Sequence, residues 1–240
     1  MTQIPGAKEV KLLGKKSLIA AWFTSMMKTC NLTAIGLKAK TGRAIAVVLC
    51  GPTDAPEFIK RTELVLTDPR VPATFQPYHE VMELPWNESQ IRVKPFVRAI
   101  EKVAIKALAQ LVHQLRSEDL EVVGVGIAGS ADRDLSKIGS FHIRAHAAEG
   151  LLFRRVLEIA AQANNLPYRS LIEKSLQTEA ASELNCTISK LNLFLTTLGR
   201  CAGPPWRADQ RVAATAAWLS LETHERKSLS SLPISVRPPN

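Results

Sequence analysis

Three apolar runs near the start of the chain, separated by short turns, constrain its fold more than any other feature. Residues 32–38, 43–50 and 58–67 have the length and apolar character of strands, and the first two flank a turn that ends at Gly42, where a positive φ is permitted. Runs joined this closely predict a three-strand antiparallel meander. The unbroken apolar stretch within 43–50 predicts a strand that is buried on both faces of the sheet.

Helical and strand-like patterns alternate along the rest of the chain. Residues 68–87 contain four prolines and predict a loop with a short edge strand over 79–84. Apolar residues spaced three and four apart then predict a helix from Pro95 to Arg116. We expect an α/β fold whose mixed five-stranded sheet has the antiparallel meander first and alternating helices and parallel strands after it. The later patterns predict, in order, a strand, a helix, a strand and two helices over residues 120–128, 143–164, 168–173, 179–198 and 208–221.

Charge and cysteine content bound the class of protein. The 240 residues carry 31 Lys and Arg against 22 Asp and Glu, a net charge of +9 that favours anionic partners such as DNA or RNA. The four cysteines include no C-x-x-C pair, so neither a disulfide framework nor a cysteine zinc motif is expected. No apolar run reaches the roughly 18 residues that a membrane helix needs, so we expect no membrane contact and a cytoplasmic location.

We expect one domain over residues 32–225, a basic N-terminal extension over 1–31 and a disordered tail over 226–240. A homodimer is possible, and the sequence does not decide the oligomeric state.

Several segments of the predicted domain resemble segments of one known protein family. Ile35-Gly-Leu-Lys-Ala-Lys-Thr-Gly-Arg43 looks like its first strand and turn, and Pro204-Pro-Trp-Arg-Ala-Asp-Gln-Arg-Val-Ala-Ala-Thr-Ala-Ala-Trp218 like its closing turn and helix. The chain thus resembles Holliday-junction resolvases of the RuvC type, members of the ribonuclease-H-like superfamily. The resemblance implies a ribonuclease-H-like fold and a place in DNA recombination. Further resembling segments are residues 136–140, 147–153, 160–167 and 179–198.

The residues that would hold metal ions in that family are mostly replaced. The resemblance implies two Mg²⁺ ions held by four carboxylates, which would activate water and stabilise the leaving oxygen. Lys38 stands where the first carboxylate ends the first strand, the central strand ends at Gly129 without an acid, and Asp209 on the closing helix lacks its second acid. We therefore expect a catalytically degenerate pseudo-enzyme without a cofactor, binding nucleic acid or a protein partner.

One alternative keeps the enzyme active. In this hypothesis the chain is a Mg²⁺-dependent, structure-specific endonuclease whose acidic ligands have moved to other positions. The candidates are the aspartates after the central strand and the acids at the ends of other elements, namely Asp209, Asp132, Asp134 and Glu121. For the pair Asp132 and Asp134, a role in capping or turns is the competing interpretation.

Basic residues form two candidate nucleic-acid contacts. Four cations recur every four residues on the predicted helix 95–116 and its start, opposite the apolar face. Such a stripe could contact successive phosphates, although solvation of an exposed helix face produces the same pattern. Three more cations surround the first turn. The candidates are Lys94, Arg98, Lys102, Lys106, Lys38, Lys40 and Arg43.

Two further motifs suggest ligand sites. Gly124-Val-Gly-Ile-Ala-Gly129 fits G-x-G-x-x-G and suggests a nucleotide or small-ligand site as a third hypothesis, but no helix begins at its last glycine, so close packing is the competing explanation. His142 and His146 have the i, i+4 spacing of zinc ligands, with Glu149 close by. Because the sequence places no third ligand there and His79 stands alone, we predict a solvated or phosphate-facing pair and no metal site.

Overall fold

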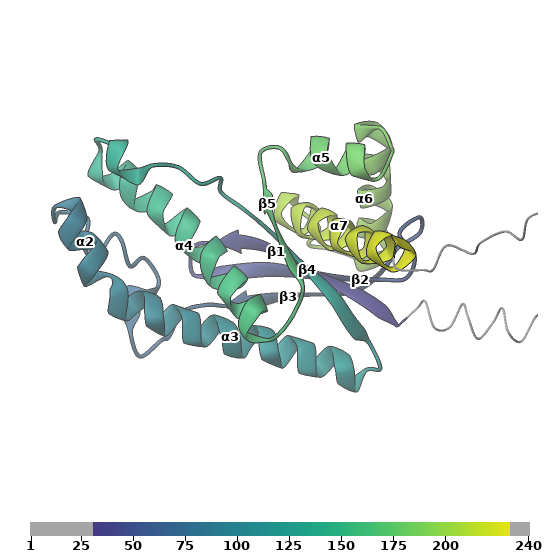
Figure 1. Cartoon of the computed structure of the whole chain (residues 1–240), viewed down its shortest axis with the longest axis horizontal. Coiled ribbons are helices and arrows are strands. Elements are labelled where there is room, and N and C mark those ends of the chain that lie inside the picture. The colour runs from purple at the N-terminus through teal and green to yellow at the C-terminus, as the bar shows by residue number, and fades with distance from the viewer. Residues whose placement is uncertain (1–30, 231–240) are drawn as a thin grey trace, which may run out of the picture.

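A mixed five-stranded sheet forms the centre of the molecule (Figure 1). The computed structural model describes residues 31–230. The strand order is β3-β2-β1-β4-β5. β2 is antiparallel to both of its neighbours, β1 and β3, whereas β4 pairs parallel with β1 and β5 pairs parallel with β4. This order confirms the predicted ribonuclease-H-like fold, with the meander first. The strands are β1 (Leu32–Lys40), β2 (Arg43–Cys50), β3 (Glu57–Val65), β4 (Glu121–Gly129) and β5 (Tyr168–Ile172).

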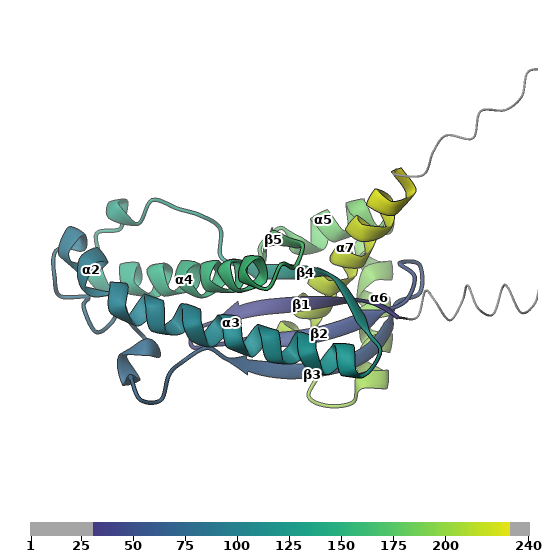
Figure 2. The same ribbon diagram turned by 60° about the horizontal axis from the view of Figure 1, so that its bottom comes forward.

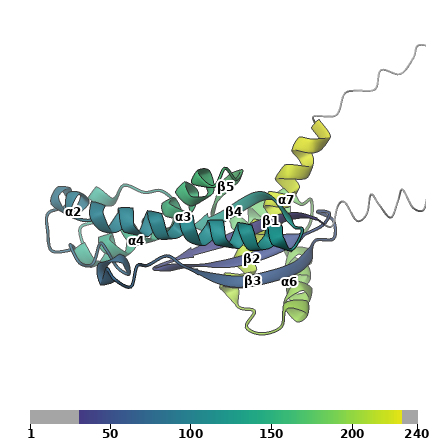
Figure 3. The same ribbon diagram turned by 90° about the horizontal axis from the view of Figure 1, so that it is seen from below.

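Helices cover both faces of the sheet. On one face α3 and α4 pack against alternate residues of β1, including Ile35 and Leu37, and in the turned views α3 crosses in front of the strands (Figures 2 and 3). On the other face α5, α6 and α7 bury Ala34 of β1 and the side chains of β4 that point toward these helices. The helix bounds are α2 (Trp86–Arg92), α3 (Lys94–Ser117), α4 (Phe141–Ala163), α5 (Leu176–Glu183), α6 (Ile188–Ala202) and α7 (Ala208–Ser230).

Two glycines bring α7 into direct backbone contact with the sheet. Gly36 of β1 and Gly126 of β4 are partners in the parallel ladder. A Cβ atom at Gly36 would lie 1.8 Å from the carbonyl oxygen of Ala213, and one at Gly126 would lie 2.1 Å from that of Ala216. The backbone of α7 therefore occupies the space of two missing side chains, and this contact fixes the position of the helix over the sheet.

The structure corrects three boundary predictions. No strand forms over 79–84, where the chain makes successive turns and the Ser89 hydroxyl donates to the carbonyl oxygens of Val81 and Leu84. The helix expected over 179–198 is broken in two, because Asn185 takes a positive φ and the Thr187 side chain caps the next helix.

The third correction concerns the end of the domain. Helix α7 continues to Ser230, so residues 226–230, predicted as the start of a disordered tail, are helical. The rest of that tail and nearly all of the predicted basic extension, residues 1–30, lie outside the described residues. Across residues 31–230, no helix combines the length and the apolar character that crossing a bilayer requires.

Candidate functional site

A lysine–glutamate pair lies at the carboxyl ends of the central strands. Lys38, near the end of β1, is only 7% exposed, and its ammonium group donates a hydrogen bond to the carboxylate of Glu173. Glu173 follows β5. Its backbone N–H donates a hydrogen bond of 3.0 Å to the carbonyl oxygen of Gly129 at the end of β4. The carboxyl end of β1 thus holds an ammonium group with its own carboxylate partner.

Asp209, the best-placed acid on the closing helix, is also paired with a lysine. Its Oδ2 lies 3.0 Å from Nζ of Lys40, which ends β1. Two carboxylates, those of Glu173 and Asp209, therefore approach the end of β1, and each of them contacts a different lysine. Carboxylates that are already neutralised in this way are poor candidates for holding two divalent cations.

The other candidate acids do not join them. Asp132 accepts hydrogen bonds from Arg154 and Arg155, at 2.8 and 3.2 Å, and the Arg154 bond above all lowers the pKa of Asp132. Asp134 accepts from the side chain and the backbone N–H of Ser136, which lowers the pKa of Asp134 and caps a short 3₁₀ turn. Glu121 begins β4 and so lies at the opposite end of that strand from the lysine pairs.

An open groove of about 810 Å³, here called the α3 groove, runs between α3 and the segment that follows β3. Arg98, Lys102 and Lys106 line it, and all three side chains are exposed. Within residues 31–230, none of these three makes an ion pair with a carboxylate. Lys94 is exposed at the first residue of α3 but does not line the groove.

The remaining predicted cations are less available. Arg43 lies 3.4 Å from the carboxylate of Glu63, and Lys38 and Lys40 hold the carboxylates described above. Arg70 also lines the α3 groove, but its guanidinium group is already hydrogen-bonded to Asp68. The side-chain hydrogen bond from Arg70 is the main reason that the pKa of Asp68 is lowered to about 2. The unneutralised charge of the groove therefore comes from the stripe on α3.

The glycine motif has a packing role. Gly124, Gly126 and Gly129 all lie within β4, and no helix begins at the last of them. Gly126 faces the backbone of α7, and Gly129 faces the aliphatic part of Arg154. The phosphate-binding geometry of a dinucleotide site, a helix N-terminus directly after the third glycine, is absent at this place.

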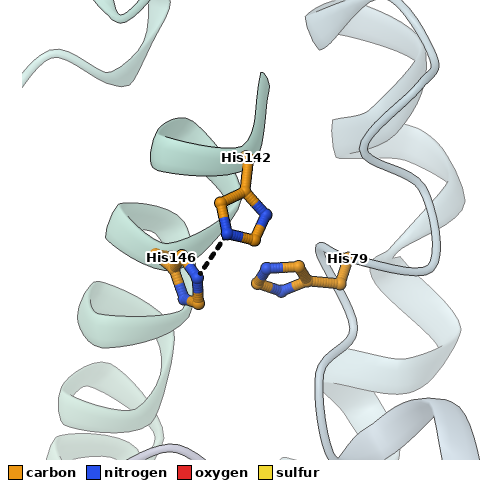
Figure 4. A group of neighbouring side chains, drawn as sticks. All are labelled: His79, His142 and His146. Atoms are coloured by element: carbon orange, nitrogen blue, oxygen red, sulfur yellow. Dashed lines mark hydrogen bonds between the residues drawn. The ribbon is translucent and has the colours of Figure 1, made fainter. Parts of the chain in front are cut away.

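Three histidines lie together beside the loop that precedes α2 (Figure 4). His142 and His146 extend from the first two turns of α4, and His79 extends toward them from the loop, so that one nitrogen of each ring lies within 4.8 Å of the others. The His79 Nδ1–H donates to Oε1 of the buried Glu149, at 2.8 Å. The prediction that His79 stands alone is wrong, because the turns of the proline-rich loop carry it to α4.

Comparisons with solved structures give a likeness of shape. The RuvC protein of Thermus thermophilus in complex with a Holliday junction substrate is 12% identical, with a TM-score of 0.44 over 83% of this chain and 96% of that chain. A second T. thermophilus RuvC structure is also 12% identical, with a TM-score of 0.43 over 82% and 96%. No protein-family model and no curated protein sequence matches this chain. Roles for individual residues therefore rest on this chain's own geometry.

Two residues of the site escaped prediction from the sequence. Glu173 could have been noticed as an acid directly after a strand that ends at the same edge as β1 and β4. His79 carries no local signal, because its partners are more than sixty positions away in the sequence.

Proposed function

We propose that this chain binds nucleic acid along the α3 groove and does not cleave it at a two-metal site. The observation that carries the proposal is the groove itself, which is open and lined by Arg98, Lys102 and Lys106. None of the three pairs with a carboxylate among residues 31–230, and the one acid that lines the groove, Asp68, is bound to Arg70. Three cations on one exposed helix face extend over about 12 Å of helix axis, which suits a linear polyanion. Phosphates of DNA or RNA are the natural anions for such an array.

The second half of the proposal concerns chemistry. Two-metal hydrolysis needs several carboxylates that converge on a pair of divalent ions. Lys38 and Lys40 bring positive charge to the end of β1 and neutralise the acids that approach it, Glu173 and Asp209. This arrangement favours a pseudo-enzyme that keeps the fold and has lost the metal site. A relocated site is not favoured, because Asp132 and Asp134 already bind arginines and cap a turn.

Neutralising the α3 stripe should weaken binding to any nucleic acid to a similar degree. In the triple variant Arg98→Gln, Lys102→Gln, Lys106→Gln, loss of three phosphate contacts should reduce the slope of log K against log salt by about 3. The affinity for branched and single-stranded DNA should fall at least about tenfold at low ionic strength. Fluorescence anisotropy over a series of salt concentrations measures both quantities.

A matched control removes the same charge elsewhere. Lys174, just before α5, and Lys190 and Arg200, on α6, are exposed and lie outside the α3 groove. Changing all three to Gln should leave the slope within one unit of the parent. Equal losses in the two triple variants would place binding outside the α3 groove. A chain that shows no salt-sensitive binding at low ionic strength would refute the nucleic-acid proposal and leave a protein partner as the alternative.

A further inference from the structure

The histidine group has an unsatisfied nitrogen at its centre. His79 Nδ1 is engaged by Glu149, which leaves Nε2 as the free ring nitrogen. That Nε2 atom is buried and has no hydrogen-bond partner among the described residues. A buried polar atom without a partner is unfavourable, and a native structure generally supplies a partner for it. The lone pair of Nε2 can accept a hydrogen bond or bind a metal ion.

Glu149 holds His79 in a tautomer and an orientation that suit a metal ligand. Its side chain is 1% exposed, and its carboxylate accepts the Nδ1–H of His79. This bond sets the tautomer in which Nε2 carries the lone pair, and it also fixes the orientation of the ring. Carboxylate–histidine pairs of this kind are the usual support of a histidine that ligates zinc, because they raise the basicity of the ligand.

The other two rings have nearly the spacing of ligands to one ion. Nε2 of His142 lies 3.1 Å from Nε2 of His146. Two nitrogens bound at 2.0–2.1 Å to a tetrahedral zinc ion would lie about 3.3 Å apart. Both side chains are exposed and lie in the first turns of α4, so small rotations can bring them to a common ion.

We propose that His79, His142 and His146 bind one Zn²⁺ ion. Imidazole nitrogens suit zinc, whereas Mg²⁺ and Ca²⁺ take oxygen ligands. Three protein ligands leave a fourth position, which the exposure of His142 and His146 opens to water or to a small ligand. The ion also joins the loop before α2 to α4, so zinc binding stabilises the contact between these two segments.

Zinc titration of the full chain tests the proposal. The protein, freed of any affinity tag and of bound metal, is titrated with Zn²⁺ against a chromophoric chelator of known affinity. One equivalent should bind, and the melting temperature should rise with added Zn²⁺. His142→Ala is the main variant, because the side chain is exposed and its removal leaves the core intact, and it should weaken binding at least 100-fold. Cobalt in place of zinc should give the visible absorption of a tetrahedral site.

Two further variants separate this site from chance binding. His113 is exposed on α3, away from the group, and His113→Ala should bind Zn²⁺ as the parent does. Glu149→Gln keeps the shape but weakens the support of His79, and it should lower the affinity 10- to 100-fold. Failure to bind one equivalent, or unchanged affinity in His142→Ala, would overturn the zinc site. The nucleic-acid proposal does not depend on either result.

Discussion

Changing Gly36 to Ala should lower the free energy of unfolding by at least about 3 kcal/mol, a large part of the stability of a typical domain. The new Cβ would lie 1.8 Å from the carbonyl oxygen of Ala213 and 2.5 Å from the backbone nitrogen of Ala217. A helix backbone cannot rotate away as a side chain can, so α7 must move off the sheet. Urea denaturation followed by circular dichroism measures the loss.

Gly139 provides the control for this prediction. It lies in the loop before α4, and a Cβ atom there would meet nothing within 4 Å. Gly139→Ala should therefore change the free energy of unfolding by no more than about 0.5 kcal/mol. If Gly36→Ala were as stable as Gly139→Ala, the conclusion that the backbone of α7 directly contacts β1 would be wrong.

Changing Lys38 to Asp should cost about 3 kcal/mol of stability at neutral pH. Lys38 is nearly buried, with 9% of its side chain exposed, and its ammonium group holds the carboxylate of Glu173. Aspartate would replace that attraction with repulsion between two carboxylates at the end of β1. Urea denaturation at pH 7 measures the effect.

Lys38→Met separates the charge reversal from the loss of the pair. Methionine keeps much of the length of lysine, and Glu173 remains 44% exposed and hydrated, so the cost should be only about 1 kcal/mol. If Lys38→Asp had the same free energy of unfolding as the parent, the fold would accommodate a carboxylate at position 38 without cost. The interpretation of the strand edge as a lysine–carboxylate pair would then fail.

The sheet could be predicted because its signals are local. Residues 44–50 are all apolar and belong to β2, which is buried over most of its length, and the turn ending at Gly42 has the expected positive φ. The strand order then follows from a meander and two parallel additions. The break between α5 and α6 was not predicted, because it depends on Asn185 adopting a left-handed conformation. Asparagine permits this conformation but also occurs within helices, so its presence alone does not indicate a break.

The site was harder to predict because its contacts join distant segments. The replacement of a carboxylate by Lys38 was visible in the sequence, but its partner Glu173 is 135 positions away. The His142–His146 pair was recognised, and without His79 it gave no reason to expect a metal. His79 was not predicted because turns in the loop between β3 and α2 set its position, and no periodic pattern encodes those turns. Glu173 directly follows β5, and bringing it to Lys38 depends on the pairing of β5 with β4 and of β4 with β1.

Cleavage of DNA is the most direct test of the account. The full chain is incubated with a branched DNA in Mg²⁺ or Mn²⁺, and the DNA is examined on native and denaturing gels. We predict a retarded complex on the native gel and intact strands on the denaturing gel, because lysines neutralise the acids at the end of β1. Metal-dependent cleavage that disappears in Asp209→Ala would contradict the account and restore an active nuclease.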